Sequence, residues 1–327
     1  MVEMAVDGEG TCNRAGAHAA MLLRGGGACP SFLHPFSHIS LNMTATGALP
    51  FRKMNGLGND FVVLDGRAHA FHMDAVKARA IADRATGIGC DQLIILEKSD
   101  VADVRMLVWN NGGGQVESCG NASRCVADLL FDERHTTSAT IDTLGGFLVA
   151  RKAGDRLVTV DNGIPRFDWK DIPLSEPFFD TRHIELQVGP IDQPLIHSPS
   201  VVNVGNPHCI FWVDDLDVVD LAKVGPMLEH HHLFPEGCNI SLARVEARDH
   251  VTLKVWERSA GLTQACGTAA CATMAAGARI KIIDRKARIT LPGGDLHMEW
   301  RTGDDHVLMT GPVAYEFDGV LPPELAP

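Results

Sequence analysis

The chain has 327 residues, of which 45% are hydrophobic and 21% charged, a composition typical of a globular protein that is long enough for two packed units. Its formal net charge of −12 disfavours nonspecific attraction to nucleic acid or anionic lipid, so we expect neither as a partner. No apolar run approaches the roughly 20 residues that a membrane-spanning helix needs.

The number of cysteines and the N-terminal residues indicate the cellular compartment in which the protein is expected. Nine cysteines are an odd number for complete disulfide pairing, and the chain is much larger than the small scaffolds that depend on disulfides. The N-terminus carries Glu3, Asp7 and Glu9 in place of a basic segment, and its apolar stretch, residues 19–23, is short for a signal peptide. We therefore expect a cytoplasmic protein.

Along the chain, the composition and the hydrophobic periodicity change after residue 50. Residues 1–50 are rich in Ala and Gly and show no sustained period, so we expect a poorly ordered N-terminal extension. Residues 61–66 then predict a strand closed by a turn, residues 74–84 a helix, and residues 93–96 a buried strand.

Comparison of the chain with itself reveals a repeat. At one offset, Cys119 falls on Cys266 (266 − 119 = 147) and Asn59 falls on Asn206 (206 − 59 = 147). Further pairs share this offset: Val104 with Val251, Val108 with Val255, Trp109 with Trp256, Gln92 with Asn239, Asn110 with Glu257, Gly114 with Gly261, and Ala122 with Ala269. Such residues are common singly, but unrelated pairs rarely share one register.

The offset predicts a duplicated fold. Two homologous halves commonly pack about a pseudo-twofold axis, which would place Cys119 and Cys266 on opposite walls of a cleft. Each cysteine precedes a helix-like segment, residues 122–130 in one half and 268–280 in the other. The N–H groups and dipole of a helix N-terminus favour anions, so we expect a lowered thiol pKa and a carboxylate site at each cysteine.

A pair of opposed cysteines suits one reaction in particular. Inverting an amino-acid α-carbon without pyridoxal phosphate needs a base on one face and an acid on the other, and a thiolate and a thiol can supply both. This mechanism requires no cofactor. The N–H groups expected to hold the substrate carboxylate are those of Gly120, Asn121, Gly267 and Thr268.

Simpler interpretations compete with this one. A lone cysteine at a helix start is often only a small buried residue, and we assign that structural role to Cys125 and Cys271, which follow at other helix faces. Zinc binding is disfavoured because the chain has no C-x-x-C pair and the histidine run at residues 230–232 has no H-x-x-x-H partner. We expect no metal site.

Five motifs, in order, resemble those of the diaminopimelate epimerase family, and the likeness extends over about residues 51–319. They are KMNGLGNDF at 53–61, CGNASRC at 119–125, GNPHC at 205–209, ERSAG with ACGT at 257–261 and 265–268, and LPGG at 291–294. Ala122-Ser123 and Leu262 differ from the residues common at these positions in the family, but neither change removes a residue of the proposed chemistry. The extension has no family counterpart, and Met43 is an alternative start.

The resemblance implies an α+β fold with two pseudo-symmetric halves, each a mixed β-sheet wrapped around a central helix, and an active site in the cleft between them. The halves would comprise residues 51–164 plus 313–327, and residues 165–312, with the final strand near 313–318 returning to the first half. It also implies a homodimer that interconverts LL- and meso-2,6-diaminopimelate in lysine biosynthesis.

Carried over by position, the resemblance makes Cys119 and Cys266 the acid–base pair. The implied substrate contacts are Asn59, Gln92, Asn110, Asn206, Asn239, Glu257 and Arg258. Arg258 can pair with a carboxylate and Glu257 with an ammonium group. His208 and Glu257 would modulate the thiol pKa values, although Phe61 stands at the position equivalent to His208 in the first half.

Two rival functions stay open at this point. A proline-racemase-like or histidine-racemase-like enzyme would use the same cysteine pair on another amino acid. A noncatalytic thiol protein that binds metal or responds to redox state would instead function with bound metal or with a stable disulfide between Cys119 and Cys266.

Overall fold

The computed structural model describes residues 49–117 and 119–326 of the chain. The expected extension therefore lies outside the described residues except at its end. There the expectation is wrong, because Leu49 is buried and Pro50 already pairs with Val320 in a sheet. Within the described part, no helix is long and apolar enough to cross a membrane.

The first half is a mixed sheet with two helices. Its elements are β1 (Pro50–Gly56), β2 (Asn59–Asp65), α1 (Ala75–Ala82), β3 (Gln92–Glu97), β4 (Val104–Asn110), β5 (Gln115–Val116), α2 (Gly120–Arg134), β6 (Ser138–Thr143), β7 (Gly146–Gly154) and β8 (Leu157–Asp161). Strand β2 is parallel to β3 and β4 is parallel to β6, whereas the other neighbours are antiparallel. Helix α1 confirms the expected helix and is capped by the Asp74 carboxylate.

From β11 (Ser200–Asn203) onward, the second half repeats this order of elements, and β9 (Gln187–Val188) and β10 (Ile196–His197) form a separate two-stranded sheet before it. The repeated elements after β11 are β12 (Pro207–Trp212), α3 (Leu221–Glu229), β13 (Asn239–Ala247), β14 (His250–Glu257), β15 (Gly261–Leu262), α4 (Gly267–Arg279), β16 (Lys286–Leu291), β17 (Gly294–Trp300) and β18 (Val307–Pro312). Strand β19 (Ala314–Val320) and a short 3-10 helix (Pro323–Leu325) follow. Strand β12 is parallel to β13 and β14 is parallel to β16, as in the first half.

The duplication extends to the pairing register. Phe61 pairs with Gln92 in the first half and His208 pairs with Asn239 in the second, which preserves the offset on both strands (208 − 61 = 147; 239 − 92 = 147). Helices α2 and α4 also begin 147 residues apart, at residues 120 and 267. The two sheets therefore place equivalent residues at equivalent points around each cysteine.

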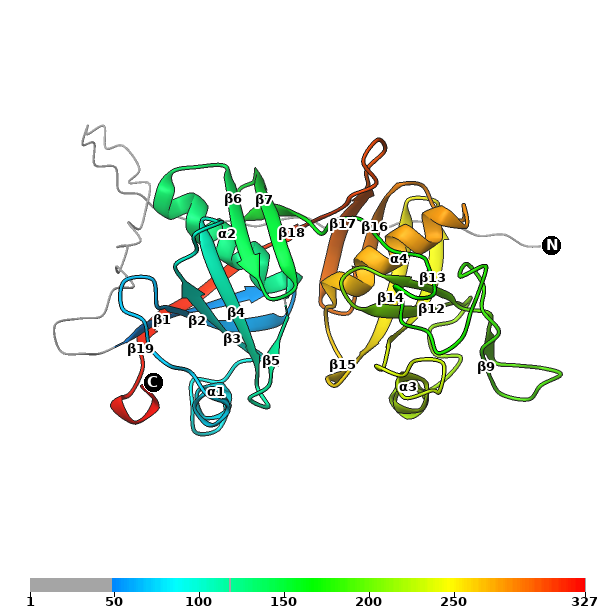
Figure 1. Ribbon diagram of the computed structural model, residues 1–327, viewed down its shortest axis with the longest axis horizontal. Coiled ribbons are helices and arrows are strands. Elements are labelled where there is room, and N and C mark those ends of the chain that lie inside the picture. The colour runs from blue at the N-terminus through cyan, green and yellow to red at the C-terminus, as the bar shows by residue number, and fades with distance from the viewer. Residues whose placement is uncertain (1–48, 118, 327) are drawn as a thin grey trace, which may run out of the picture. The chain divides into compact units, whose positions relative to one another are not determined.

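Each half is built around one buried helix (Figure 1). Helix α2 packs against β1, β6, β7 and β8, and α4 packs against β11, β16, β17 and β18. Residues 121–131 of α2 and 269–277 of α4 are buried without interruption, which is the pattern of a helix covered on all sides. Figure 1 and the strand pairing confirm the expected α+β architecture with a mixed sheet around a central helix in each half.

The pairing of β18 with β8 and one turn connect the halves, and the final strand returns to the first half. Strand β19 returns to pair with β1, as expected for the final strand, and β18 pairs with β8. The β1–β2 turn has Leu57 and Gly58 in the left-handed region, with φ of 60° and 81°. The turn packs so closely on the second half that a Cβ added at Gly293 would lie 2.0 Å from the Leu57 carbonyl oxygen.

We expect Gly293→Ala to destabilise this contact. Because the clashing atom is backbone, the turn must move, at a cost of about 1–3 kcal/mol in the free energy of unfolding. Chemical denaturation measures this cost, with Gly112→Ala as the control because an added Cβ there meets nothing within 4 Å. Equal stability of the two variants would show that the turn does not pack on Gly293.

Candidate active site

The two cysteines occupy equivalent places at the starts of the central helices. Cys119 is the N-cap residue of α2 and Cys266 that of α4, both with extended backbone and without a side-chain cap bond. Cys266 is 3% exposed, whereas Cys119 is partly exposed. Each cysteine therefore lies where the sequence placed it, directly before a helix.

The structure brings these two helix starts together. The Asn121 side chain in the first turn of α2 donates from Nδ2 to the carbonyl oxygen of Ala265, the residue before Cys266, at 3.2 Å. Both first turns also meet Met309 of β18: a Cβ added at Gly120 would lie 2.8 Å from Met309 Cε, and one at Gly267 would lie 3.0 Å from Met309 Sδ. The helix starts thus converge on one side chain.

Burial decides the ionisation of both thiols. It raises the pKa of Cys119 to about 11, against the opposing effect of the N–H groups of Ala122 and Asn121, while the charge of Glu257 raises it further. Burial also raises the pKa of Cys266 well above its usual value, again with a contribution from Glu257. The expected lowering is therefore wrong for the site as it stands: the helix N-terminus acts in the expected direction, but desolvation is the larger effect.

The predicted contact residues of the first half lie at the ends of β2, β3 and β4. Asn59 Oδ1 accepts hydrogen bonds from Asn121 Nδ2 at 3.3 Å and from the Cys119 thiol at 3.7 Å. Gln92 Nε2 donates to Asn110 Oδ1 at 2.9 Å. Gln92 Oε1 is buried without a hydrogen-bond partner among the described residues, so it is available as an acceptor.

The second half forms a matching arrangement. Asn206 Nδ2 donates to Thr268 Oγ1 at 3.4 Å, and Thr268 Oγ1 lies 3.5 Å from Cys266 Sγ. Asn206 and Thr268 are the counterparts of Asn59 and Asn121 (206 − 59 = 147; 268 − 121 = 147). Each cysteine is therefore linked by hydrogen-bond distances to an Asn at a strand start and to a polar residue of its own helix, through Asn59 in the first half and through Thr268 in the second.

Asn239 and Arg258 are joined through the backbone. Asn239 is buried, donates to the Pro207 carbonyl at 2.9 Å and accepts from the Arg258 backbone N–H at 2.9 Å. The Arg258 guanidinium donates to the Glu236 carbonyl at 3.0 Å. Asn239 thus holds the strand end that carries Arg258.

The two residues predicted to modulate the thiols differ in charge. Burial raises the pKa of Glu257, which accepts from Thr263 Oγ1 at 2.5 Å, and its charge acts on both cysteines. Burial lowers the pKa of His208 to about 3, with a contribution from the charge of Arg258, so its imidazole is neutral near pH 7. His208 Nε2 lies 2.8 Å from Asn206 Oδ1, so the imidazole contacts the residue equivalent to Asn59.

Other predicted features also have a place in the structure. Cys125 and Cys271 are completely buried in the core, as expected. The histidine run at residues 230–232 follows α3 in a turn region. No group of three or more His, Cys, Asp or Glu side chains that could hold a metal ion occurs among residues 49–117 and 119–326.

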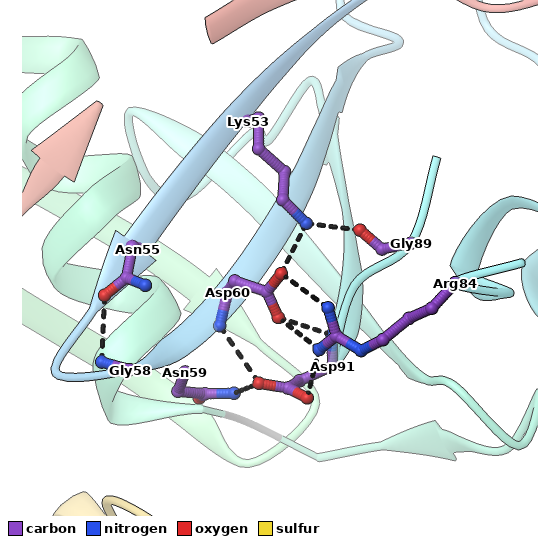
Figure 2. A network of polar contacts seen from close by, with 8 residues as sticks. All are labelled: Lys53, Asn55, Gly58, Asn59, Asp60, Arg84, Gly89 and Asp91. Carbon is purple, nitrogen blue, oxygen red and sulfur yellow. Dashed lines mark hydrogen bonds and ion pairs between the residues drawn. The ribbon is translucent and has the colours of Figure 1, made fainter. Parts of the chain in front are cut away.

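An ion-pair network behind Asn59 was missed by the sequence analysis (Figure 2). Lys53 Nζ donates to Asp60 Oδ2 at 2.5 Å, and Arg84 Nη2 bridges Asp60 and Asp91 at 2.8 and 2.7 Å. Asp91 Oδ2 accepts from Asn59 Nδ2 at 3.2 Å. The network therefore fixes the Asn59 amide with its oxygen toward Cys119. The sequence feature that could have predicted this network is the pair of opposite charges at residues 53 and 60, which lie in a hairpin of mostly buried residues.

We expect the Cys119 thiol to react only at high pH. Because burial raises its pKa to about 11, the rate of alkylation by iodoacetamide in the substrate-free protein should still be rising at pH 10, and Cys266 should react more slowly at every pH. Peptide mapping by mass spectrometry measures both rates. A Cys119 rate that reaches its plateau below pH 8 would contradict the dominance of desolvation.

We expect Asp60→Asn to destabilise the protein near neutral pH. Burial by itself would raise the Asp60 pKa, but hydrogen bonds from Arg84 and Lys53 bring it well below its usual range. Removing the carboxylate leaves Lys53, which is 4% exposed, without its anion, at a cost of about 3 kcal/mol or more. Since the folded-state pKa is depressed, the deficit should shrink as the pH falls below about 4.

Denaturation at several pH values tests this expectation. The matched control is Asp180→Asn, which breaks an exposed ion pair with Arg182 and should cost less than about 1 kcal/mol. An Asp60→Asn deficit that equals the control, or that does not change with pH, would show that the network contributes no more than a surface pair.

Known proteins resemble this chain in both halves. The family model described as diaminopimelate epimerase matches residues 51–167 and 200–316, one match in each half. A protein named diaminopimelate epimerase from Rhodopseudomonas palustris (strain BisB18) is 50% identical over 275 residues, 84% of this chain and 94% of the relative. A protein of the same name from Afipia carboxidovorans is 50% identical over 286 residues, 86% of this chain and 98% of the relative.

Solved structures of lower identity share the fold. A phenazine biosynthesis protein of the PhzF family from Bacillus anthracis aligns with a TM-score of 0.59 at 15% identity, covering 84% of this chain and 99% of the other. A hydroxyproline epimerase from Agrobacterium vitis aligns with a TM-score of 0.60 at 13% identity, covering 85% and 94%. The family match in both halves and the identity over most of the chain settle the assignment: the chain belongs to the diaminopimelate epimerase family of isomerases.

Proposed function

We propose that this protein interconverts LL- and meso-2,6-diaminopimelate with Cys119 and Cys266 as a thiolate–thiol pair, without pyridoxal phosphate. One observation carries the proposal: two cysteines 147 residues apart begin two equivalent helices whose first turns meet on Met309. The substrate comes from the family and from relatives of 50% identity that are named for it. The reaction would serve lysine biosynthesis, in the cytoplasm.

The proposed reaction moves one proton in and one proton out. The thiolate of one cysteine accepts the α-proton, and the thiol of the other donates its proton to the opposite face of the same carbon, so the charges of the two sulfur atoms are exchanged. For the reverse reaction the roles are reversed. The first-turn N–H groups of α2 and α4, which have no partner within their helices, would hold the substrate carboxylate as charge develops on the carbon.

Substrate binding would relieve the unfavourable ionisation of the thiols. The charge of Glu257 raises the pKa of both cysteines. An α-ammonium group paired with Glu257 would cancel that effect and bring a positive charge beside the sulfur atoms. In this proposal the substrate itself promotes formation of the thiolate that removes its proton.

The non-reacting end of the substrate would be held by the remaining predicted contacts. A second amino-acid end offers both an ammonium and a carboxylate group, which suit the free Gln92 Oε1 acceptor and the Arg258 guanidinium, respectively. These polar groups favour a diamino diacid over the smaller substrates of the rival racemases. We also retain as proposals the homodimer and the division into residues 51–164 plus 313–327 and residues 165–312.

The test is hydrogen exchange in deuterated water. Reduced protein without added cofactor should incorporate deuterium at the α-carbon of diaminopimelate while it converts the LL isomer to the meso isomer. Cys119→Ala and Cys266→Ala should each lose conversion by at least about 100-fold, because each removes a general acid or base. Cys209→Ala, a buried cysteine of β12 in a different part of the core, is the control and should keep turnover.

Three outcomes would contradict the proposal. Folded, reduced protein that exchanges no α-hydrogen of diaminopimelate would exclude this reaction. Exchange of proline or histidine in its place would favour a rival racemase. Full turnover by either alanine variant would show that the missing cysteine is not an acid or base in the reaction.

A further inference from the structure

Arg124 of α2 is a buried cation without an anionic partner. Its side chain is completely buried, and its contacts are a hydrogen bond from Nη2 to Asn121 Oδ1 at 2.9 Å and a contact from Nη1 to Met309 Sδ at 3.5 Å. Arg124 Nε has no hydrogen-bond partner among the described residues. No carboxylate of the described residues forms an ion pair with this guanidinium, and the acidic groups that act on it are the thiols of Cys125, Cys119 and Cys271.

The surrounding chain leaves room for this guanidinium. A Cβ added at Gly311 would lie 3.0 Å from Arg124 Cζ and Nε, and also 2.5 Å from Leu296 Cδ2. A Cβ added at Gly56 would lie 3.3 Å from Arg124 Nη2. Neither glycine has a positive φ, so the backbone does not require glycine at these positions. The absence of two side chains thus gives the guanidinium its space.

Such a residue lowers stability unless it serves another purpose. A charge without a partner in the interior lowers the stability of the folded state, and apolar replacements of buried ions are often neutral or stabilising. The charge is also confined to one half, because the position equivalent to Arg124 is Cys271 (271 − 124 = 147). An anion that forms only during the reaction would account for both facts.

The hydrogen bonds of Arg124 lead to one cysteine. Because Asn121 Oδ1 accepts from Arg124, the Asn121 amide is oriented with its NH₂ group toward Asn59 Oδ1 and the Ala265 carbonyl. Asn59 Oδ1 in turn accepts from the Cys119 thiol. Arg124 therefore determines the orientation of an amide that joins the Cys119 side of the site to the loop directly before Cys266.

We propose that Arg124 is a positioning residue of the epimerase site, which holds the Asn121 amide and whose buried charge stabilises the anionic state at Cys119 more than at Cys266. The inference rests on the proposed function for its catalytic consequence. Other groups face the same sulfur: the Glu257 charge from β14 opposes the thiolate, and Asn59 from β2 accepts from the thiol. Cys125 and Cys271 share the field of Arg124 but lie in the core.

Two substitutions separate charge from hydrogen bonding. Arg124→Lys keeps a positive charge without the planar fork, whereas Arg124→Gln keeps an N–H donor without the charge. The matched control is Arg134→Gln in the same helix, where the guanidinium is partly exposed and paired with Asp103. Alkylation of Cys119 and Cys266 against pH, kcat and KM for diaminopimelate, and the melting temperature are measured for each variant.

We expect Arg124→Gln to slow alkylation of Cys119 at pH 9 by about tenfold or more, equivalent to a rise of about one pKa unit, with a smaller change at Cys266. Arg124→Lys should stay near the wild-type alkylation profile. Both variants should lower kcat more than they raise KM, because the Asn121 amide loses its fixed orientation. The melting temperature of Arg124→Gln should not fall, and Arg134→Gln should match wild type in turnover and alkylation.

Several results would overturn the inference. A wild-type Cys119 profile in Arg124→Gln, or equal profiles in the Gln and Lys variants, would exclude the role of charge. A lowered melting temperature without any shift in alkylation would leave Arg124 a structural residue. If Arg124→Gln does not fold, the result for Arg124→Lys decides whether Arg124 is a positioning residue. A wild-type kcat in Arg124→Lys would show that the planar guanidinium is not needed to hold the Asn121 amide.

The alkylation assay also separates this inference from the proposed function. It needs no substrate, so wild-type protein that fails to epimerise diaminopimelate would overturn the function and still report the effect of Arg124 on Cys119. Conversely, normal turnover with unchanged thiol profiles in both variants would overturn the role of Arg124 alone.

Discussion

Burial of two thiols at the first turns of two equivalent helices is the constraint on which the rest of the site depends. The N–H groups of a helix start favour a thiolate, but burial raises the pKa of Cys119 to about 11 and raises the pKa of Cys266 well above its usual value. Near neutral pH both sulfur atoms are therefore protonated. Ionisation then depends on the charges that surround the sulfur atoms and on those that a substrate brings.

The backbone is symmetric about these thiols, whereas the charges are not. Asn59 and Asn206 occupy matching positions beside Cys119 and Cys266. The cations and anions have no such counterparts: the positions equivalent to Lys53, Asp60, Asp91 and Arg124 hold Ser200, Pro207, Cys238 and Cys271, and those equivalent to Glu257 and Arg258 hold Asn110 and Asn111. The two halves thus repeat the backbone around each cysteine, whereas the charged residues around the two cysteines differ.

The sequence predicted the parts of the site that repeat. The offset of 147 residues predicted the two helix starts and paired Gln92 with Asn239, and the strand register preserves that relation. It could not predict the direction of the thiol pKa shift, because desolvation depends on how completely both halves enclose each sulfur. It also missed Asp60 and Arg124, because a charged residue in a strand or helix is usually solvated, and only the fold shows that these are buried.

The central claim is that Cys119 and Cys266 act on opposite faces of one α-carbon. The stereochemistry of α-hydrogen exchange by the two single alanine variants in deuterated water tests it most directly. Each variant retains one sulfur, so the account predicts that each exchanges hydrogen at centres of one configuration only, without inversion, and that the two configurations are opposite. Exchange of the same configuration by both variants, or inversion by either, would contradict it.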